Sequence, residues 1–335
     1  MLDKTENKQL TREIGSSGIS ASAIGLGTWA IGGWMWGGTD EARSIGAIQA
    51  AIDEGISLID TAPAYGQGLA ESIVGKAIKG RRDKVVLATK CGLVWHTQKG
   101  NHFFDYDGGP VHRYLGPDSI AHEVEQSLKR LGTDVIDHYI THWQDPTTPI
   151  EDTMDALLRL KKQGKIRSIG ASNTSSAEVQ AYIDAGELDA IQEEYSMVKR
   201  DIEETHVPLC VENSVSILSY SSLALGLLSG KIGPDRKFEG DDLRKDNPRF
   251  SKSNLTKVER LMAAIEHIAQ NHNATKAQTV IAWTVQQPGI SFSLCGARDE
   301  AQAVENAKAG RLRLTASELE AISTAAAENL TDLDG

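Results

Sequence analysis

The stretch from Ile56 to Gly66, ISLIDTAPAYG, decides the fold of this chain. It predicts a short buried strand at 57–59 that stops at Asp60 and turns into a loop carrying Tyr65. A carboxylate at the end of an apolar strand is costly to bury unless a cation or hydrogen-bond donors pair with it. A neighbouring strand therefore has to supply a partner for Asp60.

Two later apolar stretches end in polar residues that suit this position. KVVLATK ends at Lys90, and VIDHYITH ends at His142. If all three stretches are parallel strands of one barrel, their carboxyl ends lie on the same rim. We then expect Tyr65 to stand there as an acid beside Lys90. Asp60 would lie behind the lysine, and His142 would orient a substrate.

Strand and helix patterns alternate along the whole chain, which indicates a parallel sheet. Eight such units in 335 residues fit a closed (β/α)8 TIM barrel, and no Gly-x-Gly-x-x-Gly marks a Rossmann domain. A hairpin signal at 15–18 precedes the barrel, and extra C-terminal helices at about 300–309 and 316–328 follow it. We expect one domain over residues 1–335. The expected strands lie at residues 23–28, 57–59, 84–90, 135–142, 165–171, 190–194, 216–221 and 290–294.

Composition narrows the class of protein. The net charge of −11, from 35 basic and 46 acidic residues, argues against a nucleic-acid surface. The chain has three widely spaced cysteines, Cys91, Cys210 and Cys295. An odd number without close spacing fits a reducing cytosol better than a set of disulfides. The first residues lack the apolar core of a signal peptide, and no apolar run reaches the roughly 18 residues of a membrane span. We expect a soluble cytoplasmic protein without membrane or nucleic-acid partners.

The order of these motifs resembles a known family. Asp60-x-x-x-x-Tyr65 after the second strand, Lys90 after the third and His142 after the fourth resemble the tetrad of the aldo-keto reductases. The resemblance runs from about residue 11 to residue 319, and it is strongest to the bacterial branch related to potassium-channel β-subunits. It implies a barrel whose floor is plugged by the hairpin, and a nicotinamide dinucleotide that reduces aldehydes or ketones to alcohols.

The chemistry of the four residues fits that activity. Free tyrosine has a pKa of roughly 10 and is a poor acid at neutral pH. The Lys90 ammonium is expected to lower that pKa, and Asp60 to keep the lysine charged and in place. Tyr65 would then protonate a carbonyl oxygen while neutral His142 donates a hydrogen bond to the same atom. Taken singly, each residue also has a structural explanation, such as a turn cap or a packed side chain.

The resemblance also implies a cofactor site. Ser172 and Asn173 resemble the pair that hydrogen-bonds the nicotinamide carboxamide, although they could simply cap the next helix. Gln192 resembles the third carboxamide partner, and Tyr195 resembles the aromatic that stacks on the nicotinamide ring. Residues 226–253 resemble a family loop over the cofactor. The remaining implied contacts are Tyr220, Ser221, Leu223, Gly226, Leu228 and Lys231 at the pyrophosphate, and Gly296, Ala297, Arg298, Gln302, Glu305 and Asn306 at the adenosine end.

The adenosine end bears on the choice of dinucleotide. Arg298 stands between a strand and a helix start, where it could pair with a 2′-phosphate or form a surface salt bridge. Gly296 and Ala297 stand where many family members have Lys and Ser, and Gln302 stands where many have Arg. These changes weaken the case for the phosphate. We still favour NADP(H) over NAD(H).

Substrate and metal are less constrained. Trp34 and Trp36 lie on a glycine-rich loop that either lines a substrate mouth or covers the barrel rim. A long polar loop at 91–116 carries three histidines, His96, His102 and His112, but without the spacing of a metal site. This mixture of side chains favours small hydroxylated aldehydes such as glyceraldehyde or methylglyoxal.

Two other functions stay open. The first is a regulatory nucleotide-binding subunit with little turnover, like the channel β-subunits. The second is an aldolase in which Lys90 forms a Schiff base, which a neighbouring carboxylate disfavours because it keeps the lysine protonated.

Overall fold

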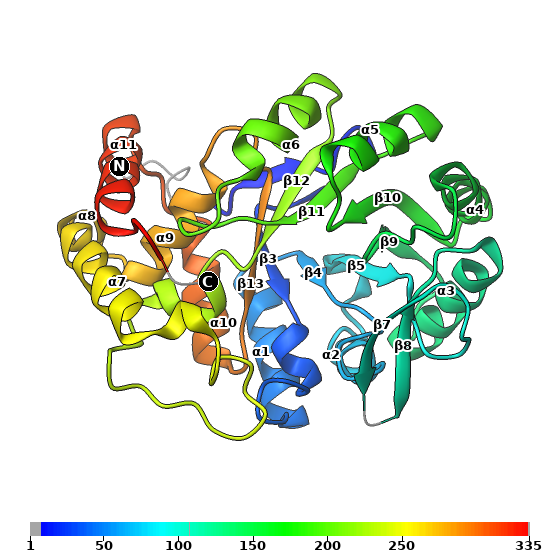
Figure 1. Cartoon of the computed structure of the whole chain (residues 1–335), viewed down its shortest axis with the longest axis horizontal. Helices are drawn as coiled ribbons and strands as arrows, with labels where there is room; N and C mark the ends of the chain where they lie inside the picture. The colour runs from blue at the N-terminus through cyan, green and yellow to red at the C-terminus, as the bar shows by residue number, and fades with distance from the viewer. Residues whose placement is uncertain (1–7, 107, 334–335) are drawn as a thin grey trace.

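The computed structural model describes residues 8–106 and 108–333 and contains a closed barrel of eight parallel strands (Figure 1). This confirms the (β/α)8 barrel expected from the alternating pattern. Going around the barrel, the order is β10-β11-β12-β13-β3-β4-β5-β9. The strands are β3 (Ile24–Gly27), β4 (Leu58–Asp60), β5 (Val86–Cys91), β9 (Ile136–Thr141), β10 (Ile166–Ser172), β11 (Ala190–Glu194), β12 (Ser216–Tyr220) and β13 (Phe292–Gly296).

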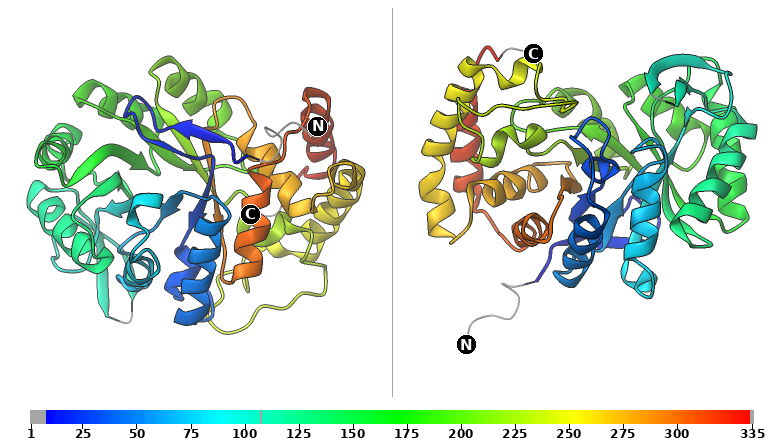
Figure 2. Two further views of the ribbon diagram at one scale, coloured as in Figure 1. Left: turned by 180° about the vertical axis from the view of Figure 1, so that it is seen from behind. Right: turned by 90° about the horizontal axis from the view of Figure 1, so that it is seen from below.

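Helices surround the barrel in both views of Figure 2. Several begin where the sequence places a cap, as at Ser175, Thr275 and Thr315, which form capping boxes. No helix in the described ranges is long and apolar enough to cross a bilayer. The helices are α1 (Glu41–Asp53), α2 (Leu69–Ala77), α3 (Pro117–Leu131), α4 (Ile150–Lys162), α5 (Ser176–Ala185), α6 (Ile202–Glu212), α7 (Lys252–Ala264), α8 (Glu266–Asn271), α9 (Lys276–Val285), α10 (Glu300–Ala309) and α11 (Ala316–Asn329).

The hairpin of β1 (Thr11–Glu13) and β2 (Ser20–Ser22) closes the floor of the barrel, as expected. Its turn packs against the start of the sheet, where the Gly15 N–H donates to Ser216 Oγ over 2.8 Å. Gly15 has a φ of +52°, and a Cβ there would lie 2.2 Å from the Asp189 carbonyl oxygen, so only glycine fits. Beneath the rim, the barrel interior is filled by Ile14, Ile19, Ala21, Leu58, Ala88, Ile140, Ala190, Leu218, Phe292 and Leu294.

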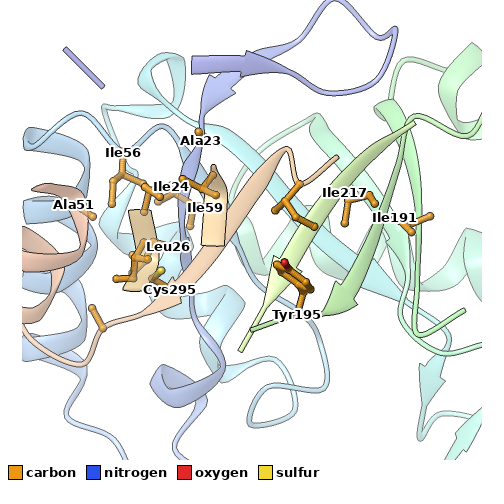
Figure 3. Packing of buried hydrophobic residues seen from close by; sticks show 14 of the residues in the cluster. Ala23, Ile24, Leu26, Ala51, Ile56, Ile59, Ile191, Tyr195, Ile217 and Cys295 are labelled. Atoms are coloured by element: carbon orange, nitrogen blue, oxygen red, sulfur yellow. The ribbon is translucent and has the colours of Figure 1, made fainter. Parts of the chain in front are cut away.

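A second, larger core fills the space between strands and helices. Ile24, Ile59 and Ile191 belong to it, as Figure 3 shows, together with many residues of the surrounding helices. Strand residues that alternate between the two cores explain why the strands read as continuous apolar runs. The structure thus buries both faces of the sheet, which holds the strand ends at the rim in fixed positions.

The segment 91–116 is not the loop that its polarity predicts. It forms a three-stranded antiparallel sheet in the order β6-β8-β7, from β6 (Leu93–Val94), β7 (Asn101–Tyr106) and β8 (Gly109–Arg113). Short strands with one exposed face contain too few apolar residues to stand out in the sequence. Figures 1 and 2 show β7 and β8 on the same side of the barrel as the long segment 226–253, and the hairpin on the opposite side.

Candidate active site

The rim brings together the four residues expected to meet there. Asp60 is the last residue of β4, Lys90 lies near the end of β5, and His142 directly follows β9. The Lys90 ammonium is fully buried and lies 2.9 and 2.8 Å from the two carboxylate oxygens of Asp60. It also lies 3.0 Å from the Thr61 carbonyl oxygen and 3.1 Å from the Tyr65 hydroxyl.

These contacts settle which way the phenol proton points. An ammonium has three protons and accepts no hydrogen bond, so Lys90 must donate to the Tyr65 oxygen. Lys90 donates its other hydrogen bonds to Asp60 and to the Thr61 carbonyl oxygen. The Tyr65 hydroxyl proton is therefore free to be donated to another oxygen. The tyrosine ring meets His142 edge-on, at 5.7 Å between ring centroids.

The electrostatics differ in one respect from the expectation. Burial raises the pKa of Tyr65; Lys90 lowers it, Asp60 raises it further, and the net shift is upward. Lys90 therefore acts as expected, but it does not outweigh burial. Burial opposes the charge of Lys90, yet Asp60 and Tyr65 raise its pKa above the usual value. Burial and Lys90 hold the pKa of His142 well below its usual range, so its ring is neutral.

A cavity of about 910 Å³ opens beside this group and extends along the rim. Most of the residues expected to contact the cofactor line it, from strands, loops and α10. They are Ser172, Asn173, Gln192, Tyr220, Ser221, Leu223, Gly226, Lys231, Gly296, Arg298, Gln302, Glu305 and Asn306.

Tyr195 corrects one expectation. Its side chain is fully buried among the apolar residues outside the cavity lining (Figure 3). It stacks on Trp283 of α9, with 6.2 Å between ring centroids. Gln192 of β11 faces the cavity, whereas Tyr195, just beyond that strand, faces the helix layer. Tyr220, at the end of β12, presents the aromatic ring to the cavity, and its hydroxyl donates to Asn173 Oδ1 over 2.7 Å.

Leu228 and Ala297 also lie differently from expected. Both side chains are buried and stand outside the cavity lining. Only their backbone groups could take part in a contact with a ligand. The position of a residue in a sequence motif predicts that it lies near the cofactor. It does not predict whether the side chain points into the cavity or into the core.

Two cationic side chains of the cavity lining, Arg298 and Lys231, have contacts that fix their direction. Arg298 donates to the carbonyl oxygens of Trp36 at 3.0 Å and Gly38 at 2.9 Å. These two backbone contacts, and not a surface salt bridge with a described residue, hold its guanidinium. Its own backbone N–H donates to Gln302 Oε1 over 3.0 Å. Lys231 pairs with Glu305 across the cavity. The Arg298 guanidinium is thus oriented toward the loop after β3.

Residues 226–253, which we call the strap, bridge the cavity to that same loop. The Asp241 carboxylate accepts from the backbone N–H groups of Met35 at 3.1 Å and Gly37 at 3.0 Å. The Leu243 N–H donates to the Met35 carbonyl oxygen over 3.1 Å. Arg244 lies over the Trp36 ring at 5.2 Å and pairs with Asp242. The strap therefore closes over the cavity through contacts that are all non-covalent.

Aromatic rings form the wall beside Tyr65, which we call the aromatic wall: Trp29, Trp34, Phe103, Phe104 and Trp143. Trp34 stacks on Phe104 at 5.2 Å, and Phe103 packs against Trp143 at 5.1 Å. Sequence reasoning did not single out Phe103 and Phe104. The signal was an apolar doublet inside an otherwise polar segment.

The histidines of 91–116 lie elsewhere. His96, His102 and His112 are absent from the cavity lining. His102 packs edge-on against His112, and His96 packs against His122 of α3. Over residues 8–106 and 108–333, no three His, Cys, Asp or Glu side chains gather as a metal site would require.

The model of the Aldo/keto reductase family matches residues 23–327 of this chain. The chain belongs to this family. Aldo-keto reductase YhdN of Bacillus subtilis is 45% identical over 292 residues, covering 86% of this chain and 85% of the relative. The NADH-specific methylglyoxal reductase of Escherichia coli is 39% identical, covering 90% and 94%.

Solved structures of the family give the same picture. The glycerol dehydrogenase AKR11B4 of Gluconobacter oxydans matches with a TM-score of 0.86 at 36% identity, covering 96% of each chain. An aldo/keto reductase of Klebsiella pneumoniae, solved in complex with NADP and acetate, matches with a TM-score of 0.70 at 29% identity, covering 92% and 93%. As an aldo-keto reductase, the protein is an oxidoreductase that uses NAD(P)H to reduce carbonyl groups.

Proposed function

We propose that this aldo-keto reductase uses NADPH to reduce small aldehydes or ketones to alcohols, with Tyr65 as the proton donor. The observation that carries the proposal is the contact of Lys90 Nζ with both the Asp60 carboxylate and the Tyr65 hydroxyl. It leaves one phenol proton unused beside a cavity large enough for a nucleotide and a small carbonyl compound.

Each residue has a role in this reaction. The bound dinucleotide supplies a hydride to the carbonyl carbon. Tyr65 gives its proton to the carbonyl oxygen, and the neighbouring Lys90 ammonium stabilises the phenolate left behind. Asp60 holds that ammonium charged. Neutral His142 donates a hydrogen bond to the same carbonyl oxygen and fixes its direction.

The cavity residues fit a nicotinamide dinucleotide. Asn173 has a φ of +56° and its amide is held by Tyr220, so it is oriented before any ligand binds. Tyr220 takes the place beside the nicotinamide ring that the family resemblance gave to Tyr195. Arg298 and Lys231 supply cations for the phosphates. Arg298 supports the phosphorylated dinucleotide, and the Klebsiella relative was solved with NADP, although the Escherichia relative is named NADH-specific.

The aromatic wall bears on the substrate. No histidine of 91–116 lines the cavity, so these side chains give no reason to favour hydroxylated aldehydes. Five aromatic rings beside Tyr65 favour carbonyl compounds with a compact apolar or planar body. Short aldehydes such as methylglyoxal remain within the proposed range, because one relative carries that activity in its name.

The test compares wild type with Tyr65→Phe on NADPH and a panel of short and aromatic aldehydes, following the loss of NADPH absorbance. We expect kcat to fall roughly 10²- to 10⁴-fold with NADPH affinity retained. The matched control is Tyr114→Phe. Tyr114 also lies beside a lysine, Lys99, and an aspartate, Asp118, but on the exposed surface. Its loss should leave turnover unchanged.

Other outcomes would favour the alternatives. Tight NADPH binding by wild type without turnover of any carbonyl would indicate a regulatory subunit like those of the channel β-subunit branch. Borohydride trapping of a substrate on Lys90 without cofactor would indicate an aldolase. The buried, charged state of Lys90 argues against such an amine nucleophile.

A further inference from the structure

Gln192 makes a contact that the carboxamide role does not explain. Its Nε2 lies 2.9 Å from Asp60 Oδ1, across the barrel and 132 residues away in the chain. The side chain is almost fully buried and lines the cavity. Asp60 therefore receives hydrogen bonds from two sides, from Lys90 and from Gln192.

The chemistry of the pair fixes the orientation of this amide. Asp60 accepts from the Lys90 ammonium, and the Gln192 atom beside its Oδ1 is Nε2, so the NH2 of Gln192 faces the carboxylate and donates to it. The Gln192 Oε1 atom then points away from Asp60. Within the part of the chain that the structure describes, no donor contacts this oxygen, and Gln192 lines the cavity. It is an acceptor held at the nicotinamide end of the cavity.

We propose that Gln192 is a positioning residue that couples occupancy of the nicotinamide site to the Asp60–Lys90–Tyr65 group. The inference rests on the proposed function. A carboxamide NH2 that donates to Gln192 Oε1 polarises the amide, which strengthens the hydrogen bond from its Nε2 to Asp60. Binding at one end of the side chain is thereby felt at the carboxylate that holds Lys90.

The coupling has a defined sign. The Gln192 N–H presents its positive end to Asp60, so removing it makes the potential around Tyr65 more negative and disfavours the phenolate. The pH above which reduction fails for lack of a phenol proton should then move upward. The other titratable groups that face this site are His138 and His142 on the β9 side, both neutral, and Tyr220 on β12. The charges of Glu193, Glu194 and Arg249 also act on Tyr220 and stay in place in every variant.

The experiment uses two variants and two ligands. Gln192→Met keeps the length of the side chain without its hydrogen bonds, and Gln192→Asn keeps the amide but is too short to span both contacts. The affinity of each protein for NADPH and for 2′,5′-ADP, which lacks the nicotinamide, is measured by titration calorimetry. The pH profile of kcat/KM is measured on one aldehyde. The matched control is Gln180→Met, because Gln180 donates to Asp184 in the same way on the exposed face of α5.

We expect both Gln192 variants to bind NADPH about three- to tenfold more weakly, as for the loss of one hydrogen bond, with the affinity for 2′,5′-ADP unchanged. The basic limb of the pH profile should rise by a few tenths of a unit to about one unit. The control should change neither quantity. The inference is overturned if NADPH and 2′,5′-ADP weaken equally, or if affinity and pH profile do not move together.

The same data separate this inference from the proposed function. If wild type reduces aldehydes and the Gln192 variants match it in NADPH affinity and pH profile, the coupling is overturned. The assignment as a reductase then stays intact. Absence of wild-type turnover on every carbonyl would overturn both. Circular dichroism and thermal unfolding of the two variants show whether each is folded. The polar, shorter Gln192→Asn keeps the test decisive if Gln192→Met does not fold.

Discussion

Replacing Asp60 with asparagine tests whether the buried ammonium of Lys90 depends on this one carboxylate. Lys90 has no exposure to solvent, and its other two contacts, with Thr61 and Tyr65, are to neutral oxygens. Breaking a buried ion pair by removing one partner costs about 3–5 kcal/mol, because the remaining charge is left without compensation. We expect Asp60→Asn to lose about this much free energy of unfolding near neutral pH.

The pH dependence of the free energy of unfolding tests the role of Asp60 more sharply than the size of the loss. In the wild type, Asp60 and Tyr65 outweigh burial, and the pKa of Lys90 lies above its usual value of 10.5. The stability from this pair is therefore fully present below that value and lost only as the pH rises through the folded-state pKa. Between about pH 6 and pH 9 its contribution should be flat.

Asparagine reverses this behaviour. Without the carboxylate, burial is largely unopposed and the folded-state pKa of Lys90 should fall below that of the unfolded chain. At Lys90 the unfolded state then binds more protons, so the stability of the variant relative to wild type should rise with pH. The slope can reach about 1.4 kcal/mol per pH unit.

Urea unfolding followed by circular dichroism at about pH 6 and pH 9 measures both quantities. Asp53→Asn is the control, since Asp53 pairs with Arg81 over 2.8 Å at the surface, where such a pair contributes at most about 1 kcal/mol. A loss in Asp60→Asn no larger than in this control, or a loss relative to wild type that does not shrink as the pH rises, would show that Lys90 does not depend on this carboxylate.

Three further predictions concern the rest of the site. Phe104→Ala removes the ring that stacks on Trp34. In steady-state kinetics, KM for aromatic aldehydes should rise about three- to tenfold, while KM for acetaldehyde stays within about twofold. Asp241→Ala releases the strap from the 34–38 loop, and stopped-flow displacement should show NADPH leaving roughly fivefold faster, as for the loss of about 1 kcal/mol. Burial raises the pKa of Glu123 to about 8 from 4.5, so the folded state binds more protons at this site and stability falls as the pH rises between these values. In Glu123→Gln this contribution should be lost, so that stability from urea unfolding falls less steeply with pH than in wild type.

The barrel was predictable because its strands are buried on both faces. Such strands read as short apolar runs, and Asp60 and Lys90 mark where two of them end. A charged residue at the end of an apolar run has few acceptable environments, so the pair could be inferred before either partner was located. The hairpin at the floor was predictable for a similar local reason, because Gly15 and Gly18 both adopt a positive φ.

The predictions that were wrong or missing depend on the orientation of side chains and on contacts between residues far apart in the sequence. The sequence around Tyr195 does not reveal that this ring turns toward α9 and leaves the cavity to Tyr220. The contact of Gln192 with Asp60 joins opposite sides of a closed barrel, and no local pattern records it.

The plugged floor has a consequence for the order of binding. The hairpin closes one end of the barrel around Gly15, so ligands reach Tyr65 from the opposite face, through the cavity that Tyr65, Asn173 and Gln192 line. If the dinucleotide binds in this cavity as proposed, a carbonyl compound that bound first would obstruct the nicotinamide site. The nucleotide should therefore dock before the smaller molecule and depart after it, which makes a compulsory sequence of steps a property of the architecture.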